Sequence, residues 1–393
     1  MKNILFSHDY PLQEGGGVEI QTYQDATELV LRGFSVCILS SRASSETYSS
    51  SKKTYPYVTD TGVILDLANS IDSIRSRIID ADIVHIQATF SMRPAMMSAM
   101  KICKELGKKY IVTLHTNASH ISFSALADMS ALEKDMYIEE FKMLLSSSLC
   151  TVVGVSQSIS QSLASLGIFK DYEVIYNAKN WNKFLASNSF SCVSIIEAVD
   201  VTYIGEVSWM KGMHVLIGAL TSITKILPNI KVRVVGGGQN KKEVQTLVQS
   251  LGLSNNVTFV QYVENKDISQ YLQATKILVQ PSLSETWGNI VMEALVCGAY
   301  PVVSNTEGLP ELVEYGRIGD VFERGDVQDF SSKILNRITN PISTYKTKES
   351  SEYIQEKYSM QNRIKSLLKI YREVSIRQER EKRKNRTIAK RSV

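Results

Sequence analysis

The stretch SETWGNIVMEALVCGAYPVV, residues 284–303, combines a helical pattern with the apolar start of a strand. On one helix, Glu285, Asn289 and Glu293 would share a face opposite the apolar face that contains Trp287. The two glutamates would then lie roughly 12 Å apart along the axis, whereas a carboxylate nucleophile and acid approach to about 5 Å. This spacing predicts that they bind two parts of one extended ligand. The alternative is an ordinary amphipathic surface helix.

The segment before this helix favours the interpretation that it binds a ligand. The apolar run KILVQ leads into it through Pro281 and Ser282, so the peptide N–H groups around residues 287–289 would face the carboxyl end of a strand. A helix N-terminus binds anions, and Gly288 would let a ligand approach the backbone closely. Ligands in open α/β sheets bind beyond the carboxyl ends of the strands, which is where this stretch is expected.

Strand-length apolar runs alternate with helical patterns along most of the chain. Continuous β-branched runs that are separated by helices predict buried parallel strands in doubly wound sheets. The runs lie at 2–7, 34–40, 81–87, 108–115 and 149–156, and then at 199–205, 230–238, 257–263, 276–281 and 299–305.

An irregular segment near 180–198 separates the two series of runs. We therefore expect an α/β chain with two Rossmann-like domains that face each other across a cleft, at 1–180 and 199–350. Residues 351–376 have helical spacing and are predicted to cross back to the first domain. Residues 377–393 form a basic tail.

Composition excludes several classes of protein. The 393 residues are 44% hydrophobic and 21% charged, which is typical of a soluble globular enzyme. No apolar run approaches the roughly 20 residues of a membrane span, and the N-terminus lacks the pattern of a signal peptide, so a cytoplasmic location is expected. The five cysteines and five histidines are dispersed, without Cys-x-x-Cys or His-x-x-x-His pairs, and predict no metal site.

The basic tail contains eight Lys or Arg residues between Arg377 and Arg391, against two glutamates. Such a tail suits anionic lipid headgroups or nucleic acid. It contains no aromatic residue, which disfavours nucleic acid. A solvated helix end is the alternative to a peripheral contact with the inner face of a membrane.

The longer stretch SETWGNIVMEALVCGAYPVVSNTEGLPELV, residues 284–313, resembles the E-x7-E signature of the retaining GT-B glycosyltransferases of family four. The order of elements is similar over roughly residues 1–375. The resemblance implies that Glu293 holds the ribose hydroxyls of a nucleotide and that Glu285 lies near the transferred sugar. It also implies that the backbone of Gly288, Asn289 and Ile290 lies beside the sugar and diphosphate.

The sequence YIGEVSWMKGMHVLI, residues 203–217, resembles the Gly-Arg…Lys-Gly phosphate clamp of this family. Gly205 and Lys211 match, and Lys211 would neutralise the departing diphosphate. Glu206 stands where the family has arginine, and its carboxylate would repel the diphosphate by about 1 kcal/mol in water-like surroundings. Either Glu206 points away from the diphosphate, or another cation takes the place of the arginine, or the affinity for the donor is reduced.

The resemblance also implies functional roles for three further segments. HDYPLQEGGGVEI, residues 8–20, is a glycine-rich loop in which Gly16 and Gly17 would approach the ligands, although such loops alone are a weak signal. His115 follows a strand, where the family keeps a histidine that touches the donor sugar. Gly236 lies in a turn that would flank the nucleotide base.

We interpret the chain as a metal-independent, retaining hexosyltransferase or related glycosyltransferase. It would move a sugar from a UDP- or GDP-sugar to a glycan or lipid-linked acceptor in bacterial surface polysaccharide synthesis, with Glu285, His115 and Lys211 as catalytic residues. No cofactor and no nucleic acid are expected. The alternatives are a non-catalytic nucleotide-sugar-binding protein and a GT-B sugar-nucleotide epimerase.

Overall fold

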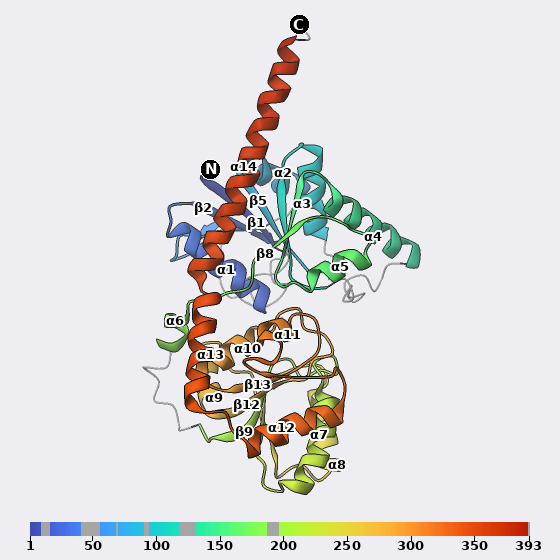
Figure 1. The fold of residues 1–393 in the computed structure, drawn as a ribbon. Helices are drawn as coiled ribbons and strands as arrows, with labels where there is room; N and C mark the ends of the chain where they lie inside the picture. The colour runs from blue at the N-terminus through green and yellow to red at the C-terminus, as the bar shows by residue number, and fades with distance from the viewer. Residues whose placement is uncertain are drawn as a thin grey trace. The chain divides into compact units, whose positions relative to one another are not determined.

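The computed structural model describes residues 1–8, 16–40, 56–67, 70–89, 94–117, 130–186 and 196–391. The chain divides into two compact units. Unit 1 comprises Met1–Ala178 with Met360–Val393, and unit 2 comprises Lys179–Ser359. Each unit is an α/β sandwich around its own sheet (Figure 1).

Unit 1 contains an eight-stranded sheet in the order β3-β4-β2-β1-β5-β6-β7-β8. All neighbours are parallel except the pair β3–β4. Strand order reverses beside β1, so the sheet is doubly wound as the sequence predicts. The strands are β1 (Asn3–His8), β2 (Ser35–Ser40), β3 (Tyr57–Val58), β4 (Ile64–Leu67), β5 (Ile83–Ala88), β6 (Tyr110–Leu114), β7 (Cys150–Gly154) and β8 (Tyr172–Val174).

Helices cover both faces of the unit 1 sheet (Figure 1). Helices α2 (Ile71–Asp80), α3 (Pro94–Glu105), α4 (Ala131–Ser146) and α5 (Ile159–Ser165) pack on one face, and α1 (Gly17–Val30) and α14 (Met360–Arg391) pack on the other. Ser70 and Ser130 begin α2 and α4 with capping boxes, which satisfy N–H groups of the first turn. Ile364, Leu367 and Tyr371 form part of the buried face of α14.

Unit 2 contains a six-stranded parallel sheet in the order β11-β10-β9-β12-β13-β14. Its strands are β9 (Val199–Ile204), β10 (Val232–Val235), β11 (Val257–Val260), β12 (Thr275–Gln280), β13 (Tyr300–Ser304) and β14 (Asp320–Phe322). Its helices are α6 (Trp181–Ala186), α7 (Met213–Ile226), α8 (Lys241–Ser250), α9 (Ile268–Gln273), α10 (Asn289–Cys297), α11 (Leu309–Leu312), α12 (Val327–Thr339) and α13 (Thr344–Lys357), with a 3₁₀ turn at Glu314–Gly316.

The end of the chain differs from the single helix expected over 351–376. Two helices occupy this region, α13 and α14, and they are separated at Tyr358 and Ser359. Tyr358 leaves helical geometry at the end of α13 (φ −106°, ψ 39°), and Ser359 instead pairs with Lys179 in a short parallel bridge.

The residues assigned to a basic tail continue α14 as far as Arg391. Lys, Arg, Gln and Glu are good helix formers, and they dominate this segment. Figure 1 shows the last turns of α14 extending past the rest of unit 1. Within the described residues, no helix is both long and apolar enough to span a bilayer.

Candidate functional site

The carboxyl ends of the unit 2 strands bring most of the predicted site residues to one edge of the sheet. Gly205 follows β9 and Gly236 follows β10, and a Cβ at Gly236 would lie 2.0 Å from the Gly205 carbonyl oxygen. A Cβ at Gly212 would lie 1.8 Å from the carbonyl oxygen of Pro281, which follows β12. Only glycine lets these loops approach each other so closely.

The start of α10 corrects the prediction that one helix carries both glutamates. Helix α10 begins at Asn289, and Glu285 lies in the loop before it. Gly288 has a left-handed conformation (φ 87°, ψ 62°), which interrupts the helical path between Glu285 and Glu293. A Cβ at Gly288 would also lie 2.6 Å from Leu309 Cδ2. The separation estimated along a single helix axis therefore does not apply.

Glu285 is held by an ion pair with Lys211. The Lys211 ammonium donates a hydrogen bond to Glu285 Oε2 at 2.7 Å, and both side chains are partly exposed. Gln280 Nε2 lies 3.4 Å from the same oxygen and donates to Ser282 Oγ at 3.0 Å. The motif after β9 and the loop after β12 are thus joined at the sheet edge.

The electrostatic surroundings of Lys211 are acidic. Burial by itself would lower the pKa of the ammonium. The carboxylates, chiefly Glu285 with smaller effects from Glu206 and Glu307, outweigh burial and raise the pKa of Lys211 above its usual value. Lys211 is therefore a stable cation at neutral pH.

Glu206 is exposed, and its charge acts on Lys211. A second cation does lie at the same edge, in the first turn of α8. The Lys241 ammonium donates to the carbonyl oxygens of Gly236 at 2.7 Å and Val260 at 3.2 Å, and lies 3.3 Å from Gln261 Oε1.

Glu293 is also paired with a lysine. It lies within α10, is 7% exposed, and accepts a hydrogen bond from the Lys179 ammonium through Oε1. Sequence analysis missed Lys179, because it is 114 residues away in the chain and belongs to no motif. The resemblance identifies the position of Glu293 but not its partner.

The remaining predicted residues lie in unit 1. His115 follows β6 and is buried, and its Nε2 lies 2.6 Å from Gln87 Oε1 at the end of β5. Gln87 is 2% exposed, and its Nε2 has no hydrogen-bond partner among the described residues. Gly16 and Gly17 are exposed at the N-terminus of α1, whereas residues 9–15 of the glycine-rich segment lie outside the described residues.

Two other polar groups have structural roles. His85 is fully buried between Tyr371 and Thr113, at 2.8 and 2.7 Å, and burial lowers its pKa to about 3. The carboxylate of Asp82 accepts hydrogen bonds from the backbone N–H groups of Lys2 and Asn3. No group of three or more potential metal ligands occurs in the described part of the chain.

Two family models match consecutive parts of the chain. Residues 15–180 match Glycosyltransferase Family 4, and residues 197–359 match Glycosyl transferases group 1. The chain belongs to the family-four glycosyltransferases. The boundary between the two matches falls within the irregular segment near 180–198 that separates the two series of strands.

This glycosyltransferase is similar to several known proteins. An uncharacterized glycosyltransferase of Methanocaldococcus jannaschii is 24% identical over 237 residues, which are 57% of this chain and 60% of that protein. The chain spans about half the length of the curated relatives that it matches.

Two solved structures show the same fold. Sucrose-phosphate synthase from Thermosynechococcus elongatus has a TM-score of 0.75 at 16% identity, covering 95% of this chain and 99% of that chain. Anabaena HepE in complex with UDP has a TM-score of 0.73 at 17% identity, covering 94% and 99%. The expected GT-B fold class is confirmed.

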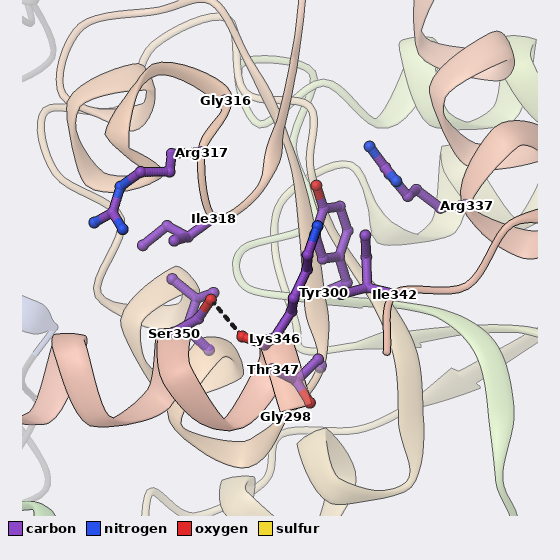
Figure 2. A pocket seen from close by; sticks show the side chains of 12 residues that line it. Gly298, Tyr300, Gly316, Arg317, Ile318, Arg337, Ile342, Lys346, Thr347 and Ser350 are labelled. Atoms are coloured by element: carbon purple, nitrogen blue, oxygen red, sulfur yellow. Dashed lines mark hydrogen bonds between the residues drawn. The ribbon is translucent and has the colours of Figure 1, made fainter. Parts of the chain in front are cut away.

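A separate cavity of about 220 Å³ lies at the opposite edge of the unit 2 sheet, near the amino ends of β13 and β14 (Figure 2). Its lining includes Tyr300, Arg317, Arg337 and Lys346. The Arg337 guanidinium binds both oxygens of Asp320, at 2.6 and 2.7 Å, so its charge is already neutralised. The cavity contains none of the predicted donor residues.

Proposed function

We propose that this glycosyltransferase transfers a sugar from a UDP- or GDP-sugar to a glycan or lipid-linked acceptor, with retention at the anomeric carbon. The observation that carries the proposal is the Lys211–Glu285 pair beside the start of α10. Membership of the family supports a transfer reaction that requires no metal ion and that retains the configuration of the anomeric carbon. Bacterial surface polysaccharide synthesis at the inner membrane face is the setting that we propose.

The chemistry would depend on electrostatic stabilisation of the leaving diphosphate. Lys211 supplies a fixed positive charge, and the N–H groups of the first turn of α10, from Asn289 and Ile290, add the positive end of a helix dipole. Glu285 is an acceptor for sugar hydroxyls, and Lys211 holds its orientation. His115, Gly16 and Gly17 in unit 1 stay predictions.

Substitution of Glu293 tests the proposed nucleotide site. UDP or GDP is expected to raise the melting temperature of the wild type, corresponding to about 2.7 kcal/mol at a hundredfold excess over Kd. Glu293→Ala should abolish this shift, because the carboxylate would hold the ribose hydroxyls. Differential scanning fluorimetry measures both. Glu264→Ala, which removes an exposed carboxylate of unit 2, is the matched control and should keep the shift. A full shift in Glu293→Ala would refute the assignment.

A non-catalytic nucleotide-sugar-binding protein is the second candidate, and the exposed carboxylate of Glu206 at the arginine position favours it. A panel of UDP- and GDP-sugars, each with glycan and lipid-linked acceptors, separates the two. Binding without turnover of any donor would support the second candidate. An epimerised nucleotide sugar, formed without an acceptor, would identify the epimerase.

We further propose that the end of α14 contacts an anionic membrane. Arg380, Lys382, Arg383 and Lys384 are exposed there. Each basic residue near such a surface contributes about 1 kcal/mol. Changing these four residues to glutamine should weaken binding to phosphatidylserine-containing vesicles by about 10³-fold at low salt. Co-sedimentation measures this binding, which 1 M salt should suppress in the wild type. Equal binding of both proteins would contradict the contact.

A further inference from the structure

Lys179 is fixed where the chain enters unit 2. Its N–H donates to the Tyr358 carbonyl oxygen at 3.2 Å, and the residue forms a parallel bridge with Ser359, the last residue of the unit. Trp181 Nε1 donates to the same carbonyl at 3.2 Å. The backbone of Lys179 is therefore held independently of its side chain.

The Lys179 side chain extends from this anchor to Glu293. Its ammonium contacts Glu293 Oε1 and lies 4.3 Å from the centroid of the Phe184 ring. The two paired side chains are only 17% and 9% exposed. The hydrogen bond from Lys179 uses Oε1 of the carboxylate and not Oε2.

A carboxylate this deeply buried is costly to keep ionised unless a charge compensates it. The ammonium supplies this charge through one oxygen and leaves the other available as an acceptor. Neutral hydroxyls bind an ionised carboxylate more strongly than they bind an uncharged acid. The geometry therefore suits a pair that is assembled before the nucleotide arrives.

We propose that Lys179 is a positioning residue for Glu293. Its ammonium compensates the negative charge of the carboxylate and orients it so that Oε2 accepts a hydroxyl of the nucleotide ribose. The proposal rests on the nucleotide-binding function above, and it adds a residue from outside the signature to the donor site.

The test measures dissociation constants by titration calorimetry for UDP and 2′,3′-dideoxy-UDP, or the guanosine pair if the wild type prefers GDP. Lys179→Met should weaken UDP binding by at least about tenfold, the scale of a hydrogen bond to a charged group. Binding of the dideoxy compound should change less than about twofold, because it lacks the hydroxyls that Glu293 would bind. Lys179→Arg should restore most of the affinity for UDP.

Lys183→Met is the matched control, because Lys183 is an exposed lysine on the neighbouring helix α6. It should bind both nucleotides like the wild type. Unchanged UDP binding by Lys179→Met would overturn the inference. So would equal losses for UDP and the dideoxy compound, since these would show a purely structural role. A wild type that binds no nucleotide would overturn the proposed function and the inference with it.

Discussion

Replacing Lys211 by methionine is expected to lower kcat for sugar transfer by at least about 10²-fold, the usual effect of removing one preorganised charge or donor from a transition state. Lys211 contacts Glu285 directly, and Glu206 and Glu307 also act on it. Without the ammonium, these carboxylates would face the developing negative charge of the diphosphate without its compensating charge. The rate should therefore fall further than the loss of a single contact implies.

Initial-rate kinetics with the best donor of the panel measure this effect. Lys242→Met is the matched control, because Lys242 is exposed on α8 and should leave kcat unchanged. Glu206→Arg in the wild-type background restores the arginine of the family motif and should lower KM for the donor. A Lys211→Met enzyme with near-normal kcat would exclude Lys211 from the chemistry.

The strand pattern predicts two doubly wound sheets, although not every strand in them. Buried parallel strands read as continuous apolar runs, and both doubly wound sheets follow from this pattern. Four strands are not among the predicted runs. β3, β8 and β14 have only two or three residues each, and Asp66 interrupts the apolar character of β4. The extent of α10 was also misjudged. The helical periodicity of the sequence continues back through Gly288 to Glu285. The left-handed backbone of Gly288 instead places the start of the helix at Asn289.

The candidate site was predictable only where a motif carried it. Lys211, Glu285 and Glu293 lie in recognisable signatures, but the signatures do not say which charges pair. Lys179 pairs with Ser359 in a short bridge and reaches Glu293 through the tertiary structure. Lys241, in the first turn of α8, reaches the carbonyl oxygen of Val260 in the same way. No local periodicity records such contacts, because they depend on how the loops after several strands converge.

Arg363→Ala is expected to destabilise unit 1 by about 3–5 kcal/mol, the typical loss when one partner of a buried ion pair is removed. Arg363 and Asp25 are 4% and 0% exposed, and the guanidinium binds both carboxylate oxygens, at 2.7 and 2.8 Å. It also donates to the carbonyl oxygens of Tyr176 and Ile175. The substitution leaves an uncompensated buried charge and two carbonyls without this donor.

Urea unfolding can resolve this loss, because all three tryptophans, at positions 181, 209 and 287, lie in unit 2. The circular dichroism transition of unit 1 should move to lower urea concentration, whereas tryptophan fluorescence should be unchanged. Arg372→Ala, an exposed change on α14, should move neither signal. A loss below about 1 kcal/mol for Arg363→Ala would contradict the expectation.

The double variant Asp25→Leu/Arg363→Leu separates the two sources of this effect. It removes both charges and replaces them with apolar groups, so it should be more stable than Arg363→Ala although it lacks the ion pair. Arg363→Lys should stay destabilised, since an ammonium cannot reproduce the two-point contact with the carboxylate and reach the carbonyls as well. If the double variant were instead the least stable of the three, the result would show that attraction within the pair, rather than the penalty of an orphaned charge, holds α14 against the rest of unit 1.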